Sequence, residues 1–362
     1  MIDLDNIDEI KKLDKSDVYG SVVALPKQCE HAWEDTKDMV VPIDYKNINN
    51  IVMAGMGGSG LAARVIEGVY GLKLPCPLIR INDYDLPAWV NEKTLVICSA
   101  FSGTTEEPLE ILRQALEKKA KVMTIGAGAT IIEIAQKEKI PYYKINPVYN
   151  PSKQPRMAVG YSLVGQLVMV SKTGAISITK KEITEMMDAM VKVQENLLVS
   201  VKESENSAKQ MAKKLYEKKV VFAAARHMMG GAHVVKNQMN ENAKNFAAIF
   251  DIPELNHHLM EGLRYPDSNS RDLIYVFLDS NLYPERIQKR FAITKDVVSK
   301  NNVEVVSWKA HSSNQLSQAF EFIQFGSFVN LYLAMLNDLD PAPIPWVDYF
   351  KTQLGQSLGE FK

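Results

Sequence analysis

The chain has 362 residues and a formal net charge of -1 at pH 7, from 42 basic and 43 acidic residues. This length is enough for two α/β domains with a sizeable core. The near-neutral balance excludes a global field that would hold a polyanion such as nucleic acid. The start of the chain is polar and acidic, and eighteen consecutive uncharged apolar residues occur nowhere, so we expect neither export nor a membrane span.

The cysteines and histidines indicate a cytoplasmic protein without a metal. Cys29, Cys76 and Cys98 form no C-x-x-C pair, and such an odd, sparse set is typical of a reducing compartment. The histidines lack the H-E-x-x-H pattern, and the six-residue gap between His227 and His233 does not place both on one helical face. We therefore interpret these two histidines as structural.

In chain order, residues 1 to about 48 predict helices and loops that form a packing arm. Short apolar runs then occur at 51–54, 78–81, 95–98 and 122–125, and they are separated by helical patterns such as 106–119. Strands that alternate with helices in this way predict a doubly wound parallel sheet. We place the end of this first domain near residue 175.

The second half of the chain repeats this pattern. Residues 180 to about 216 contain neither proline nor glycine and predict a long bridging helix. The expected strands are 220–225, 273–278 and 303–307, and the expected helices are 232–244, 284–300, 314–337 and 345–358. The sequence therefore predicts an N-terminal domain (1–175), a bridging helix (176–210) and a C-terminal domain (211–362), with a ligand at or near the domain junction.

Two turns in the first domain have the composition of an anion site. Gly55 to Gly60, with the sequence GMGGSG, follows a strand and opens a helix, where free backbone N–H groups and the positive helix end favour an anion. Residues 99–107 repeat this arrangement with several hydroxyls after a neighbouring strand. The alternatives are a tight glycine turn, helix-capping hydroxyls, and a dinucleotide site with Asp83 or Asp85 on the ribose.

The order of these motifs resembles that of a known family. The two turns are similar to the paired phosphate-binding turns of the sugar isomerase (SIS) fold. Three further segments resemble the bifunctional phosphoglucose/phosphomannose isomerases within it: Gln154-Pro155-Arg156, the pair 240–244 and 254–257, and Asp348-Tyr349-Phe350-Lys351. The matching segments span residues 55 to 351. The resemblance implies two tandem SIS-type, flavodoxin-like α/β domains with helical arms.

The resemblance also implies an activity, which is interconversion of glucose 6-phosphate, and of mannose 6-phosphate, with fructose 6-phosphate through a cis-enediolate. The family pattern assigns the phosphate to Gly58, Ser59, Ser102 and Thr105. Ala100 stands where the usual Ser-x-Ser-Gly-x-Thr turn has its first serine. The alternatives are that Ser99 or Thr104 replaces this hydroxyl or that the affinity for phosphate is lower. No cofactor is implied, and the family shares each active site across a homodimer.

Glu241 and Arg156 fit the chemistry of such an isomerisation. One carboxylate can remove a proton beside a carbonyl and return it to the next carbon, and a fixed guanidinium stabilises the enediolate charge as it develops. Glu241 lies on a predicted helix between Asn240 and Asn242. The alternatives are a solvated helix glutamate and an ordinary arginine at a helix start after proline.

His257 and Lys351 resemble the family pair that opens the sugar ring. His258 follows directly, so the sequence alone leaves open which of the two histidines faces the site, although the Glu-Leu-Asn-His register favours His257. A histidine that packs in a loop is the alternative for His257. Lys351 borders an apolar stripe on its predicted helix, and a solvated helix face is the alternative for it.

Two rival functions remain at the sequence level. A regulatory SIS protein would bind sugar phosphates without catalysis, although this neutral chain shows no basic appendage for nucleic acid. A different phosphosugar isomerase, acting on amino sugars or heptoses, is the second rival.

Overall fold

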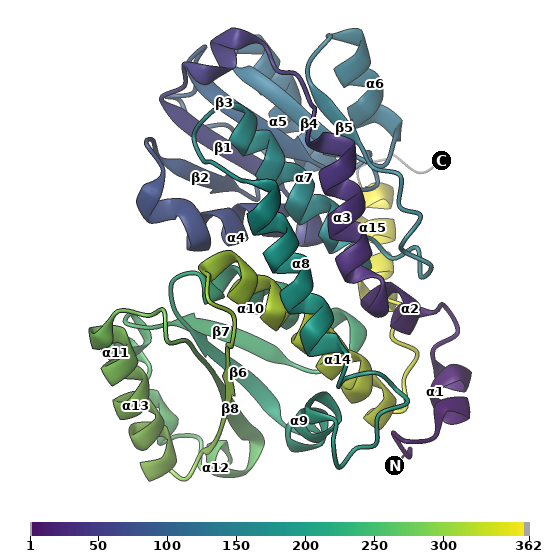
Figure 1. Cartoon of the computed structure of the whole chain (residues 1–362), viewed down its shortest axis with the longest axis vertical. Coiled ribbons are helices and arrows are strands. Elements are labelled where there is room, and N and C mark those ends of the chain that lie inside the picture. Colours follow the sequence, from purple (N-terminus) through teal and green to yellow (C-terminus); the bar gives the residue numbers. More distant parts are fainter. Residues whose placement is uncertain (1, 358–362) are drawn as a thin grey trace.

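The computed structural model describes residues 2–357, which form two parallel β-sheets joined by helices (Figure 1). The first sheet has the strand order β2-β1-β3-β4-β5, and the second has the order β7-β6-β8-β9. The strands are β1 (Asn50–Gly55), β2 (Leu78–Ile81), β3 (Thr94–Ser99), β4 (Lys121–Gly126), β5 (Tyr142–Lys144), β6 (Lys219–Ala224), β7 (Ala247–Asp251), β8 (Leu273–Asp279) and β9 (Glu304–Lys309).

Helices follow most of the strands and form the arms and the bridge. The α-helices are α1 (Ile7–Leu13), α2 (Val18–Val23), α3 (Leu25–Thr36), α4 (Leu61–Tyr70), α5 (Glu106–Glu117), α6 (Ala129–Lys137), α7 (Val159–Lys172), α8 (Lys180–Gln194), α9 (Ser207–Leu215), α10 (Met228–Asn242), α11 (Leu255–His258), α12 (Asn269–Asp272), α13 (Glu285–Lys300), α14 (Gln315–Leu336) and α15 (Pro345–Ser357). The 3-10 helices are η1 (Ile43–Lys46), η2 (Gly57–Gly60), η3 (Gly71–Lys73), η4 (Pro155–Met157) and η5 (Glu261–Leu263).

This strand order confirms the predicted doubly wound α/β fold. In each sheet the first strand has the second strand on one side and the third on the other. The chain therefore reverses its winding direction between β1 and β3, and again between β6 and β8. Ligands of open α/β sheets bind in the crevice beyond the carboxyl ends of the strands at such a switch point. In the first sheet this is where β1 ends at Gly55, opposite Ser99 of β3.

The expectation of one long helix from residue 180 to about 216 is wrong. α8 ends at Gln194, and α9 begins at Ser207 after a stretch of turns. The Asn206 side chain accepts hydrogen bonds from the backbone N–H groups of Ala208 and Lys209. This cap satisfies free donors at the start of a new helix. The absence of proline and glycine therefore does not keep this segment in one helix, and the second helix begins at its own capping residue.

The two halves of the chain pack directly on each other through α4 and α10. A β-carbon on Gly230 of α10 would lie 2.4 Å from the Val65 Cα of α4, and one on Gly68 would lie 3.0 Å from the Arg226 carbonyl oxygen. Figure 1 shows both helices at the level between the two sheets. Val234 belongs to the same apolar cluster as the helices of the first domain. The junction is therefore a shared core that fixes the two sheets relative to each other.

One helix in residues 2–357 is long and apolar enough to cross a membrane by length and composition. This helix is α14, and all of its apolar window is buried inside the fold. It packs against α8, α9 and α10. α14 is therefore a central core helix of the structure.

We expect Gly230→Ala to destabilise the protein, because the added methyl group has no room against the α4 backbone. Insertion of a carbon into a packed core costs about 1–3 kcal/mol, and thermal or denaturant unfolding measures it. Gly262→Ala is the matched control, since a β-carbon there meets nothing within 4 Å. Equal stability of the two variants would contradict this account of the junction.

Candidate active site

The two predicted anion turns lie side by side at the switch point of the first sheet. The Ser59 hydroxyl of η2 accepts a hydrogen bond from the Phe101 backbone N–H at 3.0 Å, which ties the turn after β1 to the turn after β3. Gly57 and Gly103 have φ angles of 50° and 81°, which glycine adopts without strain. At Gly103 a β-carbon would lie 1.9 Å from the Gly128 carbonyl oxygen, so only glycine fits there.

Three hydroxyl groups gather at the turn after β3. The Ser102 hydroxyl lies 3.3 Å from the Thr105 hydroxyl and 3.3 Å from the Thr104 hydroxyl. Ser102 and Thr104 are exposed, and Thr105 is half-buried at the start of α5. The structure therefore gathers Ser102 and Thr105 as the sequence predicts, and it adds Thr104 to the group.

Ser99 points into the protein. Its hydroxyl is within hydrogen-bond distance, 3.1 Å, of the Gln166 amide nitrogen, and only 2% of the residue is exposed. The same amide donates to the Ser59 carbonyl oxygen. Of the two residues that the sequence leaves open as substitutes for a serine at position 100, only Thr104 therefore presents its hydroxyl at the surface of the turn.

Arg156 is buried next to the first turn and is held by a set of fixed acceptors. A β-carbon on Gly58 would lie 3.5 Å from the Arg156 Cα, so the arginine and the turn touch. The guanidinium donates from Nε to Asn242 Oδ1, from Nη1 to Gln154 Oε1, and from Nη2 to the carbonyl oxygens of Pro341 and Ala342. A guanidinium has five N–H groups, so within residues 2–357 one N–H on Nη1 is left for an outside acceptor.

Glu241 lies beside this arginine at the end of α10. Its Oε2 is 3.9 Å from Arg156 Nε, and 30% of its side chain is exposed. Burial raises the pKa of Glu241, while the charges of Arg156, Lys236, Lys351 and Lys244 pull that pKa in the opposite direction. A half-buried carboxylate whose pKa is raised by burial, yet which is surrounded by cations, suits a base that must take up and return a proton.

Lys351 reaches the same region from α15. Burial raises the pKa of Glu241 and lowers that of Arg156. The exposed Lys351 side chain opposes the first shift with its charge, and Asp348 of the same helix opposes the second. The segment before α15 is also fixed here, because Arg156 binds Pro341 and Ala342, and Lys244 Nζ donates to the carbonyl oxygens of Asp340 and Pro341. Residues 337–344 therefore tie α15 to the candidate site.

His257 does not join these residues within one chain. It is exposed on α11, and Figure 1 shows α11 and α15 at opposite sides of the molecule. His258, in contrast, has its Nδ1 within 3.0 Å of the Glu254 carbonyl oxygen and its ring against Phe250. Within residues 2–357 the His257 side chain has no such contact, so it is the candidate of the two for an outside ligand.

The chain is similar to known proteins along most of its length. A family model described as the bacterial phospho-glucose isomerase C-terminal SIS domain matches residues 204–354. A curated bifunctional phosphoglucose/phosphomannose isomerase of Caldicellulosiruptor bescii is 32% identical over 344 residues, which cover 94% of this chain and 99% of that protein. This chain belongs to the bifunctional phosphoglucose/phosphomannose isomerase family. The family predicted from the sequence is thereby confirmed.

Other relatives agree with this membership at lower identity. The bifunctional phosphoglucose/phosphomannose isomerase of Aquifex aeolicus is 27% identical, with 93% of this chain and 98% of that protein covered. A D-glucosamine-6-phosphate 4-epimerase of Sulfolobus acidocaldarius is 26% identical over 70% of this chain and 76% of that protein.

Solved structures support the SIS fold. The C-terminal domain of the glucosamine-fructose-6-phosphate aminotransferase of Francisella tularensis superposes with a TM-score of 0.67, at 13% identity, and covers 89% of this chain and 96% of that one. A hypothetical protein of Thermus thermophilus reaches a TM-score of 0.72 at 15% identity, over 93% of this chain and 89% of that one. Both show the fold that the family predicts.

Several residues that were not predicted from the sequence contact or act on the candidate site residues. Gln166 braces both anion turns, Asn242 orients Arg156, Lys244 holds residues 340–341, and Lys236 acts on Glu241. Gln166 leaves a sequence signal, because it is a lone amide in the apolar run of α7. Asn242 and Lys244 lie inside the motif 240–244 itself. Lys236 has no comparable signal, since an exposed helix lysine is common.

His227 and His233, which the sequence analysis interprets as structural, lie in buried or half-buried positions. His227 is fully buried with its Nε2 2.8 Å from Gln318 Oε1. Burial, with the charges of Arg64 and Lys236, lowers the pKa of His233 to about 3. Among the described residues no three His, Cys, Asp or Glu side chains form a group that suits a metal ion.

We expect Lys236→Met to raise the pKa of Glu241 further, because it removes a positive charge that favours the ionised carboxylate. The carboxyl 13C signal of Glu241, followed through a pH titration, gives this pKa directly. Lys192→Met on the exposed face of α8 is the control and should leave the titration unchanged. A Glu241 pKa that is the same or lower in Lys236→Met would contradict this electrostatic account.

Proposed function

We propose that this chain is an aldose–ketose isomerase that interconverts glucose 6-phosphate and mannose 6-phosphate with fructose 6-phosphate. Its family membership supports this activity, as do the names of its relatives. The single observation that carries the mechanism is the contact chain from Gly58 through Arg156 to Glu241. It joins the proposed anion-binding turn to the proposed base through a fixed cation.

In this mechanism the phosphate group is a handle that does not react. Gly58 and Ser59 of the first turn and Ser102 and Thr105 of the second would donate hydrogen bonds to it, aided by the start of α5. Binding energy from this distant group then orients C1 and C2 of the sugar against Glu241.

The reacting end of the sugar would meet four side chains. His257 and Lys351 transfer protons between the ring oxygen and the C1 hydroxyl, which opens the ring. Glu241 then removes the proton from C2 of the aldose, and the electron pair moves through the new C1–C2 double bond onto the carbonyl oxygen O1. A proton passes from the C2 hydroxyl to O1, and the same carboxyl group returns its proton to C1 as C2 becomes the carbonyl carbon. Arg156 stabilises the enediolate charge with its remaining N–H. The reverse reaction starts at C1 of the ketose, and no cofactor takes part.

The proposal includes a homodimer in which His257 comes from the partner chain. Its support is that α11 lies away from α15 in a single chain (Figure 1), so one chain alone leaves the site without its histidine. We also propose a cytoplasmic location, which agrees with the three free cysteines in the structure.

The proposed division of the chain follows the two sheets. Residues 1–175 contain β1 to β5, residues 211–362 contain β6 to β9, and residues 176–210 form the bridge, which holds α8 and the start of α9. Glu241 and Lys351 would then come from the C-terminal domain, and Arg156 from the N-terminal one. Catalysis would depend on the junction between the domains.

The decisive variant is Glu241→Gln, which keeps the shape and removes the base. We expect turnover of fructose 6-phosphate to fall by about 10²–10⁴-fold, while calorimetry shows that the sugar phosphate still binds. Glu133→Gln, at an exposed position of α6, is the control and should keep full turnover. Unchanged turnover in Glu241→Gln would reject the assignment. The aldose phosphates formed by the parent chain identify the substrate, and a product other than glucose or mannose 6-phosphate would favour another phosphosugar enzyme.

Complementation between inactive variants tests the shared site. Glu241→Gln and His257→Asn chains should each be inactive alone, but after unfolding and refolding together roughly a quarter of wild-type turnover is expected, because half of the random dimers regain one intact site. Reassembly of each variant by itself is the control. No recovery in the mixture, with hybrid dimers shown to form, would place His257 and Glu241 of one chain in the same site.

Thr104 should contribute to phosphate binding in place of a serine at position 100. Thr104→Val removes one hydrogen bond to a charged acceptor, worth about 1.5–3 kcal/mol, so we expect the affinity for inorganic phosphate to fall by about tenfold or more. Phosphate titration by calorimetry measures this without any turnover. Ala100→Ser added to Thr104→Val should restore affinity, and Thr184→Val on the exposed face of α8 should have no effect. An unchanged phosphate affinity in Thr104→Val would exclude the contact.

A further inference from the structure

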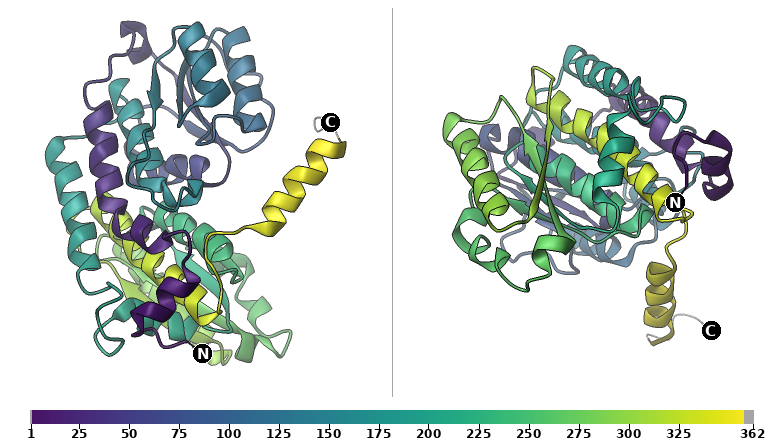
Figure 2. Two further views of the ribbon diagram at one scale, coloured as in Figure 1. Left: turned by 90° about the vertical axis from the view of Figure 1, so that its right-hand side faces the viewer. Right: turned by 90° about the horizontal axis from the view of Figure 1, so that it is seen from below.

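The C-terminal helix α15 exposes an apolar face that nothing in its own chain covers. Trp346 is 81% exposed, Tyr349 60% and Phe350 63%, and within 345–357 only Gly355 is buried. Figure 2 shows this helix, in yellow, extending away from the rest of the chain. An isolated helix of this length is barely stable in water, and clustered exposed aromatic residues are typical of an interaction site. The face of α15 therefore needs a partner surface.

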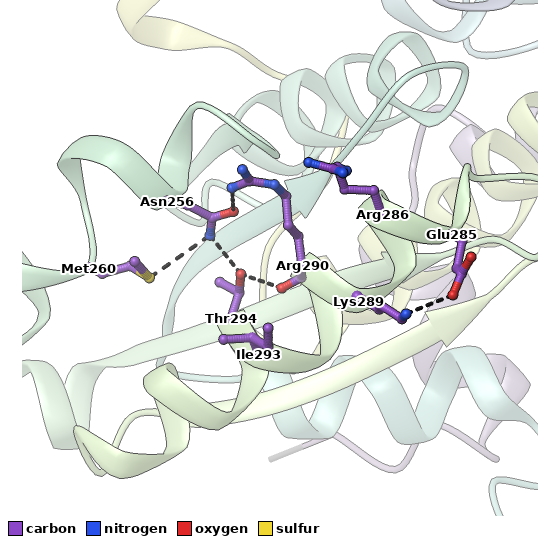
Figure 3. Close-up of a pocket in the computed structure, with 8 residues that line it drawn as sticks. All are labelled: Asn256, Met260, Glu285, Arg286, Lys289, Arg290, Ile293 and Thr294. Carbon is purple, nitrogen blue, oxygen red and sulfur yellow. Dashed lines mark hydrogen bonds and ion pairs between the residues drawn. The ribbon is translucent and has the colours of Figure 1, made fainter.

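A groove of matching chemistry lies between α11 and α13, on the far side of the chain. It has a volume of about 590 Å³ and is lined by Asn256, Met260, Glu285, Arg286, Lys289, Arg290, Ile293 and Thr294 (Figure 3). Ile293 is 63% exposed and supplies an apolar wall together with Met260. Arg290 donates to Asn256, and Lys289 pairs with Glu285, while Arg286 has no ion pair within residues 2–357.

The proposed shared site brings these two surfaces together, and the inference rests on that proposed function. Lys351 of α15 acts on Glu241 of its own chain, whereas His257 has to come from a second chain. Side chains that converge on one hexose belong to neighbouring elements, so the partner's α11 must lie next to α15. Asn256 lines the groove and directly precedes His257. The partner's groove therefore lies beside the uncovered face of α15.

We propose that α15 of each chain docks in the α11–α13 groove of a second copy. Trp346 and Phe350 are four residues apart and form one ridge of the helix, which fits the apolar wall made by Met260 and Ile293. The cationic groove rim complements Asp348 and the aromatic faces, since guanidinium groups stack on such rings. Lys351 lies about 100° around the helix from Phe350, so docking leaves it on the side of Glu241.

This arrangement is self-complementary. Each chain offers one helix and one groove, so a two-fold axis satisfies both surfaces at once and closes the dimer. Docking would also position the partner's His257 beside Lys351, which makes the interface part of the site. The mode is that of an amphipathic helix laid in a groove.

A cross-linking experiment tests the docking. Phe350→Cys and Ile293→Cys are made in separate full-length chains that also carry Cys76→Ser, because Cys76 is the one native cysteine that is not buried. The two chains are mixed, allowed to exchange subunits and oxidised. We expect a covalent dimer on a non-reducing gel from the mixture and none from either chain alone. Phe350→Cys mixed with Val40→Cys, at a position that is 86% exposed, is the control and should give none.

Several outcomes would overturn the proposal. These are a monomeric chain in sedimentation, a dimer without the cross-link, and a double variant that closes the bond within one chain. Turnover of fructose 6-phosphate by the parent chain is measured in parallel. Failure of the cross-link with full turnover rejects the docking alone, whereas absence of turnover in the parent chain rejects the proposed function.

Discussion

The arrangement of the site depends on the hydrogen bonds of the Arg156 guanidinium. This buried cation touches the first anion turn at Gly58, lies 3.9 Å from Glu241 and binds the carbonyl oxygens of Pro341 and Ala342 before α15. A buried charge is tolerated only when its donors are satisfied, so the acceptors around it have to keep their positions. One side chain thereby fixes the turn, the candidate base and the start of the C-terminal helix relative to one another.

This constraint explains why the domain junction is so closely packed. Arg156 comes from the first half of the chain, whereas Asn242, Glu241 and the residues before α15 come from the second half. A small shift between the sheets would break several charge-assisted hydrogen bonds at once. The close contact of α4 with α10 at Gly230 prevents such a shift. The packing of the core and the geometry of the site are therefore linked, and a change at the glycine contact should reach the site.

The sequence predicted the fold better than the contacts among the candidate site residues. Strong apolar runs gave the inner strands, whereas the edge strands β5 and β7 were missed because they are short and only partly buried. The separate start of α9 was missed because its signal is a single capping residue, Asn206. Motifs pointed to Arg156 and Glu241, but neither periodicity nor spacing shows that Arg156 is clamped by carbonyl groups 185 and 186 residues away. The sequence also does not show that the Ser99 side chain points into the protein, because this depends on Gln166 of α7.

The most direct measurement is a crystal structure with a phosphorylated sugar acid whose carboxylate mimics the enediolate. We expect its phosphate on Ser59, Ser102 and Thr105, and its carboxylate end within hydrogen-bond distance of Glu241 and the free N–H of Arg156, with the partner's His257 near the ring-opening position. A ligand whose phosphate occupies the turns while its other end points away from Glu241 and Arg156 would contradict the central claim that one hexose phosphate reaches from the turns to these two side chains.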